Sequence, residues 1–364
     1  MKKILQISNL PNNLLHVGGY IRQYKIREQL KQGFIVKNCS FSFTDMDDYY
    51  VDFDFFIKKS NFNNSNKKNI EQSLYLCQYL LDKKRILIKY INNTIKKYDP
   101  DIIILETPYL YDFFTFLKSI NAISKECQLV YSSHNLEQRL QSNLPKEQLE
   151  EVIRLENLCV KNSSFQICCS VEEQEIMPNA YLFPNGTDKI INNFEYLKKT
   201  EMGDIALDKY VTVSSYHLPN ILGIKRVLNY LPESTKLVLI GECCNYDYQS
   251  DKVIKLGVLS NEDMQYIINI SNGILLPIYE GGGTNLKTAQ SIVSNKAIIA
   301  TEFSFRGFEK YMYSDGIFIY KHDNELINIL NTPKEKHYYR EVEGLFWDEI
   351  LSKIVDVFQH KSKK

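Results

Sequence analysis

Three consecutive glycines at positions 281–283 stand between an apolar run that ends at Tyr279 and a helical pattern that reaches about residue 294. Glycine allows backbone N–H groups to approach an anion closely, and the unsatisfied N–H groups and dipole of a helix N-terminus favour negative charge. Thr284 or Asn285 can cap the helix that follows. A strand, a glycine turn and a helix N-terminus in this order predict a binding site for a phosphate group.

Lys287 falls in the first turn of the same helix, where the helix dipole repels a cation unless an anion is bound nearby. A diphosphate would supply that anion. A Walker-type phosphate loop requires glycine directly before the lysine, and Leu286 stands there, so the segment does not predict a nucleoside triphosphatase. The alternative is a plain glycine turn with Lys287 pointing to solvent, but three glycines exceed what a turn needs, which favours the anion site.

Two features of the first half of the chain are further candidates for ligand contact. Gly18 and Gly19 follow the first apolar run and open a helical pattern. Their spacing is not GxGxxG, and no acidic residue ends a second strand, so a dinucleotide-dependent dehydrogenase is disfavoured. His134 lies just past another apolar run, but a lone histidine is more often a structural residue, and the sequence alone leaves its role open.

Short apolar runs alternate with helical patterns along the whole chain and predict strands at 3–8, 34–41, 102–106, 129–133, 165–170, 181–184, 211–215, 237–241, 253–257, 274–278, 297–301 and 317–320. Continuous apolar strands separated by helices indicate α/β structure with parallel sheets covered on both faces. Turn residues and charges accumulate over 183–210, where we expect an interdomain linker. The pattern predicts two doubly wound domains facing a central cleft, with ligands beyond the carboxyl ends of the strands.

The composition excludes several classes of protein. Lys plus Arg and Asp plus Glu are both 44, so no net positive field attracts nucleic acid. The eight cysteines are scattered without CxxC pairs, which predicts reduced thiols in a cytoplasm and no metal site. No signal-peptide region and no apolar run of about 20 residues is present. A basic amphipathic pattern over 83–97 is expected to cover the following strand, with contact to a membrane surface as the alternative.

Taken in order, segments over nearly the whole chain resemble the family 4 glycosyltransferases of the GT-B fold. The segments are GGYIRQYKIREQLKQGFIV, SSHNLEQR, RLENLCVKNSSFQICCSVEEQ, FPNGTD, SSYHLPNILGIKRVLNYLP, KLVLIGE, GGGTNLKTAQSIVSNKAIIATEFSFRG and FWDEILSKIVDVF. The GGGTNLK segment is moderately specific to that family, and the order of all the segments along the chain makes the resemblance strong. The resemblance implies a Rossmann-like acceptor-binding domain at 1–190, a Rossmann-like nucleotide-sugar-binding domain at 205–342, and a C-terminal helix within 343–364, over residues 345–358, that crosses back to the first domain.

The resemblance also implies an activity. A retaining glycosyltransferase would move a sugar from a nucleotide diphosphate donor to a glycan or lipid-linked acceptor, in surface polysaccharide or glycoconjugate synthesis. It would act in the cytoplasm or at the inner face of the membrane, without a metal ion or bound cofactor. The catalytic residues implied are His134 and Lys287. The donor-binding residues implied are Gly18, Gly19, Ser215, Asn220, Gly281, Gly282, Gly283, Thr284, Asn285, Gln290 and Arg306.

Two departures from the family pattern leave other functions open. Many relatives carry glutamates at the positions of Gly282 and Gln290, and many use an Arg and a Lys on the diphosphate where this chain has SSYHLPN. One alternative is a catalytically weak subunit of the same fold that binds a glycan or a partner protein. The other is a sugar-nucleotide epimerase on this fold.

Overall fold

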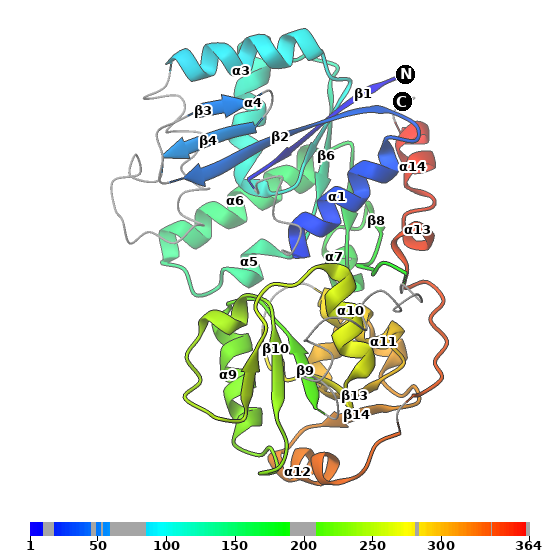
Figure 1. Cartoon of the computed structure of the whole chain (residues 1–364). Helices are drawn as coiled ribbons and strands as arrows, with labels where there is room; N and C mark the ends of the chain where they lie inside the picture. The colour runs from blue at the N-terminus through cyan, green and yellow to red at the C-terminus, as the bar shows by residue number, and fades with distance from the viewer. Residues whose placement is uncertain are drawn as a thin grey trace. The chain divides into compact units, whose positions relative to one another are not determined.

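The computed structural model describes residues 1–9, 18–44, 49–51, 54–58, 85–189, 209–280, 284–335 and 337–361. The chain divides into two compact units, Met1–Pro184 with Leu351–Lys364, and Asn185–Ile350. The predicted domains are 1–190 and 205–342, followed by a C-terminal segment at 343–364. Residues 185–190 and 343–350 fall in the second unit, and the segment from residue 351 falls in the first. Each unit has its own sheet, as Figure 1 shows.

An eight-stranded sheet forms the centre of the first unit, in the order β3-β4-β2-β1-β5-β6-β7-β8. All neighbours pair in parallel except β3 with β4. The chain runs from β1 outward to β2 on one side, and β5 then lies on the other side of β1, so the winding direction reverses between β1 and β5. The strands are β1 (Lys3–Ser8), β2 (Ile35–Thr44), β3 (Tyr49–Val51), β4 (Asp54–Lys58), β5 (Ile102–Leu105), β6 (Gln128–Ser132), β7 (Phe165–Cys168) and β8 (Ala180–Leu182).

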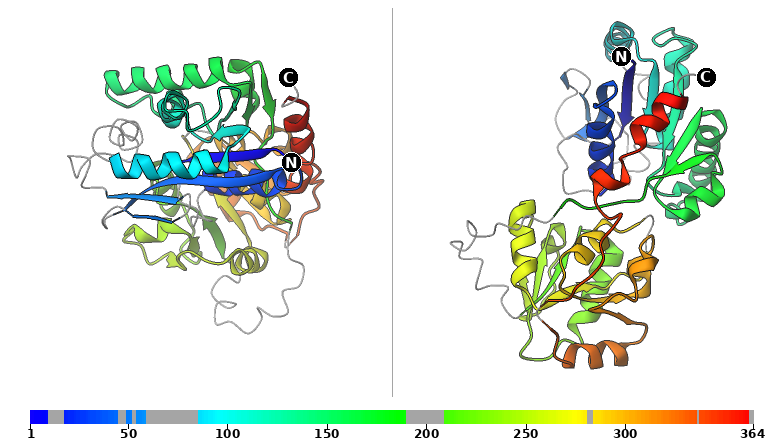
Figure 2. Two further views of the ribbon diagram at one scale, coloured as in Figure 1. Left: turned by 90° about the horizontal axis from the view of Figure 1, so that it is seen from above. Right: turned by 90° about the vertical axis from the view of Figure 1, so that its right-hand side faces the viewer.

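Helices cover both faces of this sheet. Successive residues of a strand point to opposite faces, so each strand contributes side chains to the packing on both sides. Leu5 and Ile7 pack in a core with α3, α4 and α6, and this core includes Ile91 and Ile95 of α3. On the other face, Gln6 contacts α1, and α14 lies beside α1 (Figure 1 and Figure 2). The helices are α1 (Gly18–Leu30), α3 (Arg85–Tyr98), α4 (Tyr111–Ser119), α5 (Glu137–Leu140), α6 (Lys146–Asn162), α7 (Val171–Ile176) and α14 (Ile354–Lys361).

The second unit is a six-stranded, wholly parallel sheet in the order β11-β10-β9-β12-β13-β14. One buried core joins the sheet to α10 and α11, and a second joins its other face to α9 and α12. The winding direction reverses between β9 and β12. The elements are β9 (Tyr210–Val213), α9 (Leu218–Leu228), β10 (Leu237–Ile240), β11 (Val253–Lys255), α10 (Asn261–Ile270), β12 (Gly273–Leu276), α11 (Leu286–Val293), β13 (Ala297–Thr301), β14 (Ile317–Tyr320), α12 (Asp323–Asn331) and α13 (Trp347–Ile350).

All twelve predicted strands are present, with ends shifted by a few residues, and the prediction of two doubly wound α/β domains is confirmed. Two strands were missed, β3 and β4, and the first sheet is therefore not wholly parallel. Both are short, YYV and DFFIK, and they follow one another so closely that the sequence shows no helical pattern between them, which is the signal that separated the other strands. The helix implied over 345–358 is instead two short helices, α13 and α14, separated by a turn at residues 351–353. In the part of the chain that the structure describes, no helix combines the length and apolar character needed to cross a membrane.

Candidate functional site

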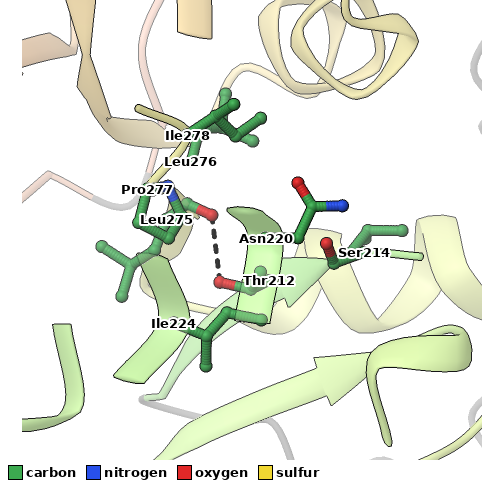
Figure 3. Close-up of a pocket in the computed structure, with 9 residues that line it drawn as sticks. Thr212, Ser214, Asn220, Ile224, Leu275, Leu276, Pro277 and Ile278 are labelled. Atoms are coloured by element: carbon green, nitrogen blue, oxygen red, sulfur yellow. Dashed lines mark hydrogen bonds between the residues drawn. The ribbon is translucent and has the colours of Figure 1, made fainter. Parts of the chain in front are cut away.

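A small pocket lies at the carboxyl ends of β9 and β12, where the second sheet reverses its winding direction (Figure 3). Ligands of doubly wound sheets bind at this kind of switch point. The hydroxyl of Thr212 donates to the carbonyl oxygen of Leu275 at 3.0 Å, and this hydrogen bond links β9 to β12 at the pocket. The lining residues are Thr212, Val213, Ser214, Asn220, Ile224, Leu275, Leu276, Pro277 and Ile278.

A glycine lets helix α9 approach this pocket. A Cβ atom at Gly223 would overlap the carbonyl oxygen of Pro277, which is backbone and cannot move aside as a side chain could. At the start of α9, the amide of Asn220 donates to the hydroxyl of Ser215 at 3.1 Å. The predicted donor-binding residues Ser215 and Asn220 are therefore in contact with each other, and Asn220 lines the pocket.

Lys287 reaches from α11 to the end of β9. Its Nζ donates to Ser214 Oγ at 3.2 Å, and the side-chain oxygen of Asn285 caps α11 by accepting the N–H of Lys287. The solvent-pointing alternative is therefore wrong for this lysine. Within the described residues no carboxylate forms an ion pair with it. Desolvation lowers the pKa of Lys287 to about 8, and desolvation followed by the charge of Lys287 lowers the pKa of His217.

The glycines expected to form the loop, Gly281, Gly282 and Gly283, lie outside the described residues. The residue after them, Thr284, accepts a hydrogen bond from Asn185 Nδ2 at 2.6 Å. This contact joins the predicted loop to the FPNGTD segment. Gly307 has φ +84°, and a Cβ atom there would overlap the Thr284 side chain, so glycine is needed for both its backbone conformation and its packing. The neighbouring Arg306 places its guanidinium 4.6 Å from the ring centre of Phe303.

Gln290 points to a different neighbour from that of Lys287, although both lie on α11. Its Nε2 is 3.6 Å from the sulfur of Met264 on α10. The contact with the ribose of a nucleotide stays a prediction for this side chain.

In the first unit, Gly18 and Gly19 are the first two residues of α1, as the sequence predicts. They follow β1, which borders the switch point between β1 and β5. The residues that join β1 to α1, 10–17, lie outside the described part of the chain. A helix that begins beside a switch point offers backbone N–H groups to a ligand.

His134 is paired with a buried carboxylate that the sequence analysis missed. Glu106 follows β5, His134 follows β6, and because the two strands are neighbours their side chains meet, with Glu106 Oε2 2.7 Å from His134 Nε2. Burial alone would raise the pKa of Glu106, but the contacts with His134 and Gln6 outweigh it, and the pKa lies below its ordinary value. An acidic residue directly after the apolar run IIIL is the sequence signal that could have found it.

A second buried acidic cluster fixes the segment after His134. Glu156 accepts the backbone N–H groups of Glu137 and Gln138 at 2.9 and 3.1 Å, and the hydroxyl of Tyr109 donates to Glu137. Desolvation raises the pKa of both carboxyl groups. These contacts hold the start of α5 and thereby the end of the turn that carries His134.

The cysteines within the described residues are free, and all of them except Cys244 are buried. Across the described ranges no three side chains of the metal-ligating types His, Cys, Asp and Glu gather at one point.

The fold of the chain is shared with solved structures of other proteins. HepE (Alr3699) of Anabaena in complex with UDP and glucose is 14% identical, with a TM-score of 0.67 over 99% of this chain and 100% of that one. Its complex with UDP-glucose has a TM-score of 0.64 at 14% identity, covering 99% and 100%. A UDP-forming α,α-trehalose-phosphate synthase from Burkholderia xenovorans is 11% identical, with a TM-score of 0.57 over 100% of this chain and 99% of that one.

The two Rossmann-like units and these similarities define the GT-B fold. No protein-family model and no curated protein sequence matches the chain.

Proposed function

We propose that the chain is a glycosyltransferase that moves a sugar from a nucleotide diphosphate donor to a glycan or lipid-linked acceptor. One observation carries the proposal: the ammonium of Lys287 lies at the β9–β12 switch point with a neutral hydroxyl, Ser214 Oγ, as its hydrogen-bond partner. Removing part of the water around a cation without supplying a counter-charge costs free energy, and the lowered pKa of Lys287 reflects that desolvation. A bound diphosphate would supply the missing negative charge.

The same residues fit the chemistry of a leaving diphosphate. Negative charge grows on the diphosphate as the bond to the sugar breaks, and a fixed cation with fixed N–H groups stabilises that charge without reorganisation. Lys287 supplies the cation, and α11 begins beside it. The proposal includes retention of configuration, because in the enzymes that the sequence resembles the leaving phosphate itself helps to take the acceptor proton. It also includes a reaction without a metal ion, in surface polysaccharide or glycoconjugate synthesis at the cytoplasmic side.

The first test is binding. Solved neighbours of this fold hold UDP and UDP-glucose, so uridine diphosphate is the first nucleotide to assay. A ligand that binds the folded state alone adds about 2.7 kcal/mol of stability at 100 times its dissociation constant. Uridine diphosphate or another nucleoside diphosphate should therefore raise the melting temperature of the chain, and the rise should vanish in Lys287→Met.

A matched control is Lys321→Met, because Lys321 lies in the same unit but is exposed and already paired with Glu302 at 3.2 Å. It should keep the full thermal shift. If no nucleoside diphosphate shifts the wild-type chain, the proposal is wrong.

The second test is turnover of nucleotide sugars with and without an acceptor. Lys287→Ala should lower transfer by about 100-fold or more, as for loss of one charge-stabilising contact in a transition state. Activity is expected to survive a chelator, and a rate restored by magnesium or manganese would contradict the metal-free reaction. Diphosphate binding without any donor consumption would support the weak-subunit alternative. Conversion of the donor without an acceptor would support the epimerase.

A further inference from the structure

A string of buried polar side chains crosses the first unit from α1 to the residue after β6. Arg27 Nη1 lies 3.5 Å from Gln6 Oε1, Gln6 Nε2 lies 2.5 Å from Glu106 Oε1, and Glu106 Oε2 lies 2.7 Å from His134 Nε2. The Glu106 side chain is fully buried and that of His134 is 11% exposed. Four elements distant in sequence thus meet through one line of hydrogen bonds.

The donor groups of Arg27 and Gln6 determine which atom donates and which accepts in each of these hydrogen bonds. A guanidinium donates and cannot accept, so Gln6 must turn its oxygen toward Arg27 and its NH2 toward Glu106. The carbonyl oxygen of Gln23 accepts from the same NH2 at 3.1 Å, which independently requires the same orientation. Glu106, ionised, accepts at both oxygens. The nitrogen that faces it, His134 Nε2, must therefore carry a proton.

The other ring nitrogen leads to the same assignment. His134 Nδ1 is buried and has no hydrogen-bond partner within the described part of the chain. A proton moved from Nε2 to Nδ1 would be a buried donor without an acceptor, and it would leave the lone pair of Nε2 facing the lone pairs of the Glu106 carboxylate. We infer that Glu106 is a positioning residue that fixes the neutral tautomer of His134, with the proton on Nε2 and an acceptor lone pair on Nδ1.

The tautomer decides which ligand groups the ring can meet. A neutral histidine that presents an acceptor at Nδ1 can take a hydrogen bond from a hydroxyl but not from an ionised phosphate, which has no proton to give. The inference thus assigns His134 Nδ1 to hydroxyl groups of the sugar or acceptor and not to the diphosphate. Because Nδ1 is covered in this structure, the contact requires the groups that cover it to move when the ligand binds. Only this last step rests on the proposed function.

The assignment is tested by long-range 1H–15N spectra of the unliganded chain with 15N-labelled histidine, where His134→Gln identifies the signal of His134. The wild-type ring should show the tautomer protonated at Nε2. In Glu106→Gln, the NH2 of Gln6 still demands an acceptor, so the new amide turns its oxygen to Gln6 and its NH2 to His134. Nε2 must then accept, and the signal should change to the tautomer protonated at Nδ1.

The matched control is Glu151→Gln, the same chemical change at a partly exposed carboxylate of the same unit that pairs with Arg154. It should leave the tautomer of His134 unchanged, as should Glu106→Asp, which keeps the charge. A wild-type ring protonated at Nδ1, or an unchanged tautomer in folded Glu106→Gln, overturns the inference. The wild-type spectrum decides by itself if Glu106→Gln does not fold.

Kinetics provide the second readout. Glu106→Gln should lower kcat for transfer by about 10- to 100-fold, by analogy with the loss of the outer hydrogen-bond partner of a metal-bound histidine. The dissociation constant for the nucleoside diphosphate should stay unchanged. A loss of diphosphate binding equal to the loss of kcat overturns the hydroxyl assignment. A wild-type chain that transfers no sugar would overturn the proposed function and leave the tautomer assignment standing.

Discussion

The lowered pKa of Lys287 predicts that the proposed binding of a diphosphate to the second unit depends on pH. The pKa of Lys287 is about 8, so the side chain is largely protonated at pH 7 and largely neutral at pH 9. A phosphate group loses its second proton near pH 6, so the charge of the ligand changes little between pH 7 and pH 9. Above pH 7, the protonation of Lys287 therefore determines how the affinity for the ligand changes with pH.

We predict that affinity for a nucleoside diphosphate falls as pH rises from 7 to 9. The bound anion favours the protonated lysine, so binding near pH 8 should also take up a proton from the buffer. Calorimetry in two buffers of different ionisation enthalpy measures both effects. In Lys287→Met the affinity should be weak and independent of pH, and a wild-type affinity that rises with pH would contradict the assignment.

Gln290 stands where many of the family 4 glycosyltransferases that the sequence resembles carry a glutamate. An amide can accept one hydrogen bond of a ribose hydroxyl and donate another, but a carboxylate contact is roughly twice as strong. We predict that Gln290→Glu tightens nucleoside diphosphate binding, measured as a lower dissociation constant, and that Gln290→Leu weakens it. If neither substitution changes the constant, Gln290 does not touch the donor and the weak-subunit alternative gains support.

The elements of the fold could be predicted from sequence where burial dictates residue type. Twelve strands lie inside sheets covered on both faces, and the continuous apolar runs this requires are visible in the sequence. The Glu106–His134 pair could not be predicted in the same way. Its two members are 28 positions apart and meet only because β5 pairs with β6, which is a property of the sheet order. The inward orientation of Lys287 could be predicted because its place in the first turn of α11 is a local property of the sequence.

The close approach of α9 to β12 makes one glycine decisive for the pocket. We predict that Gly223→Ala costs about 3 kcal/mol of unfolding free energy, the upper range for overpacking, because the new methyl group meets the carbonyl of Pro277. The thermal shift by a nucleoside diphosphate should also be reduced, since α9 carries Asn220. Leu222→Ala, at the exposed neighbouring position, is the control and should change stability by much less. Equal stabilities of the two variants would contradict the prediction, because they would show that α9 can shift away from Pro277 without a cost in free energy.

At the scale of the whole molecule, the first unit is built from two separate stretches of chain. Phe358 of α14 is fully buried and packs edge-to-face on Phe34 and Phe165, with ring centres 6.1 and 5.0 Å apart. A Cβ atom at Gly33 would overlap Val355, so the turn after α1 also fits against α14. The last helix thus completes the core of the first unit.

We predict that Phe358→Ala lowers the stability of the first unit by about 3–5 kcal/mol, as for truncation of a buried phenylalanine. The single tryptophan, Trp347, is buried in the second unit and reports its unfolding separately. Urea unfolding followed by circular dichroism should gain an early transition, while tryptophan fluorescence keeps its midpoint. The exposed substitution His360→Ala serves as the control, and a fluorescence midpoint that falls together with the dichroism would contradict this division.

The position of α14 in the chain has a consequence for biosynthesis. The N-terminal stretch emerges first from the ribosome during synthesis. The apolar surface around Phe34 and Phe165 stays uncovered until the residues after 350 emerge. At roughly 5–20 residues per second, translation of the intervening unit takes on the order of ten seconds or more. During that interval the second unit can fold as it appears, while the earlier one presents a site for chaperones or for nascent chains on neighbouring ribosomes.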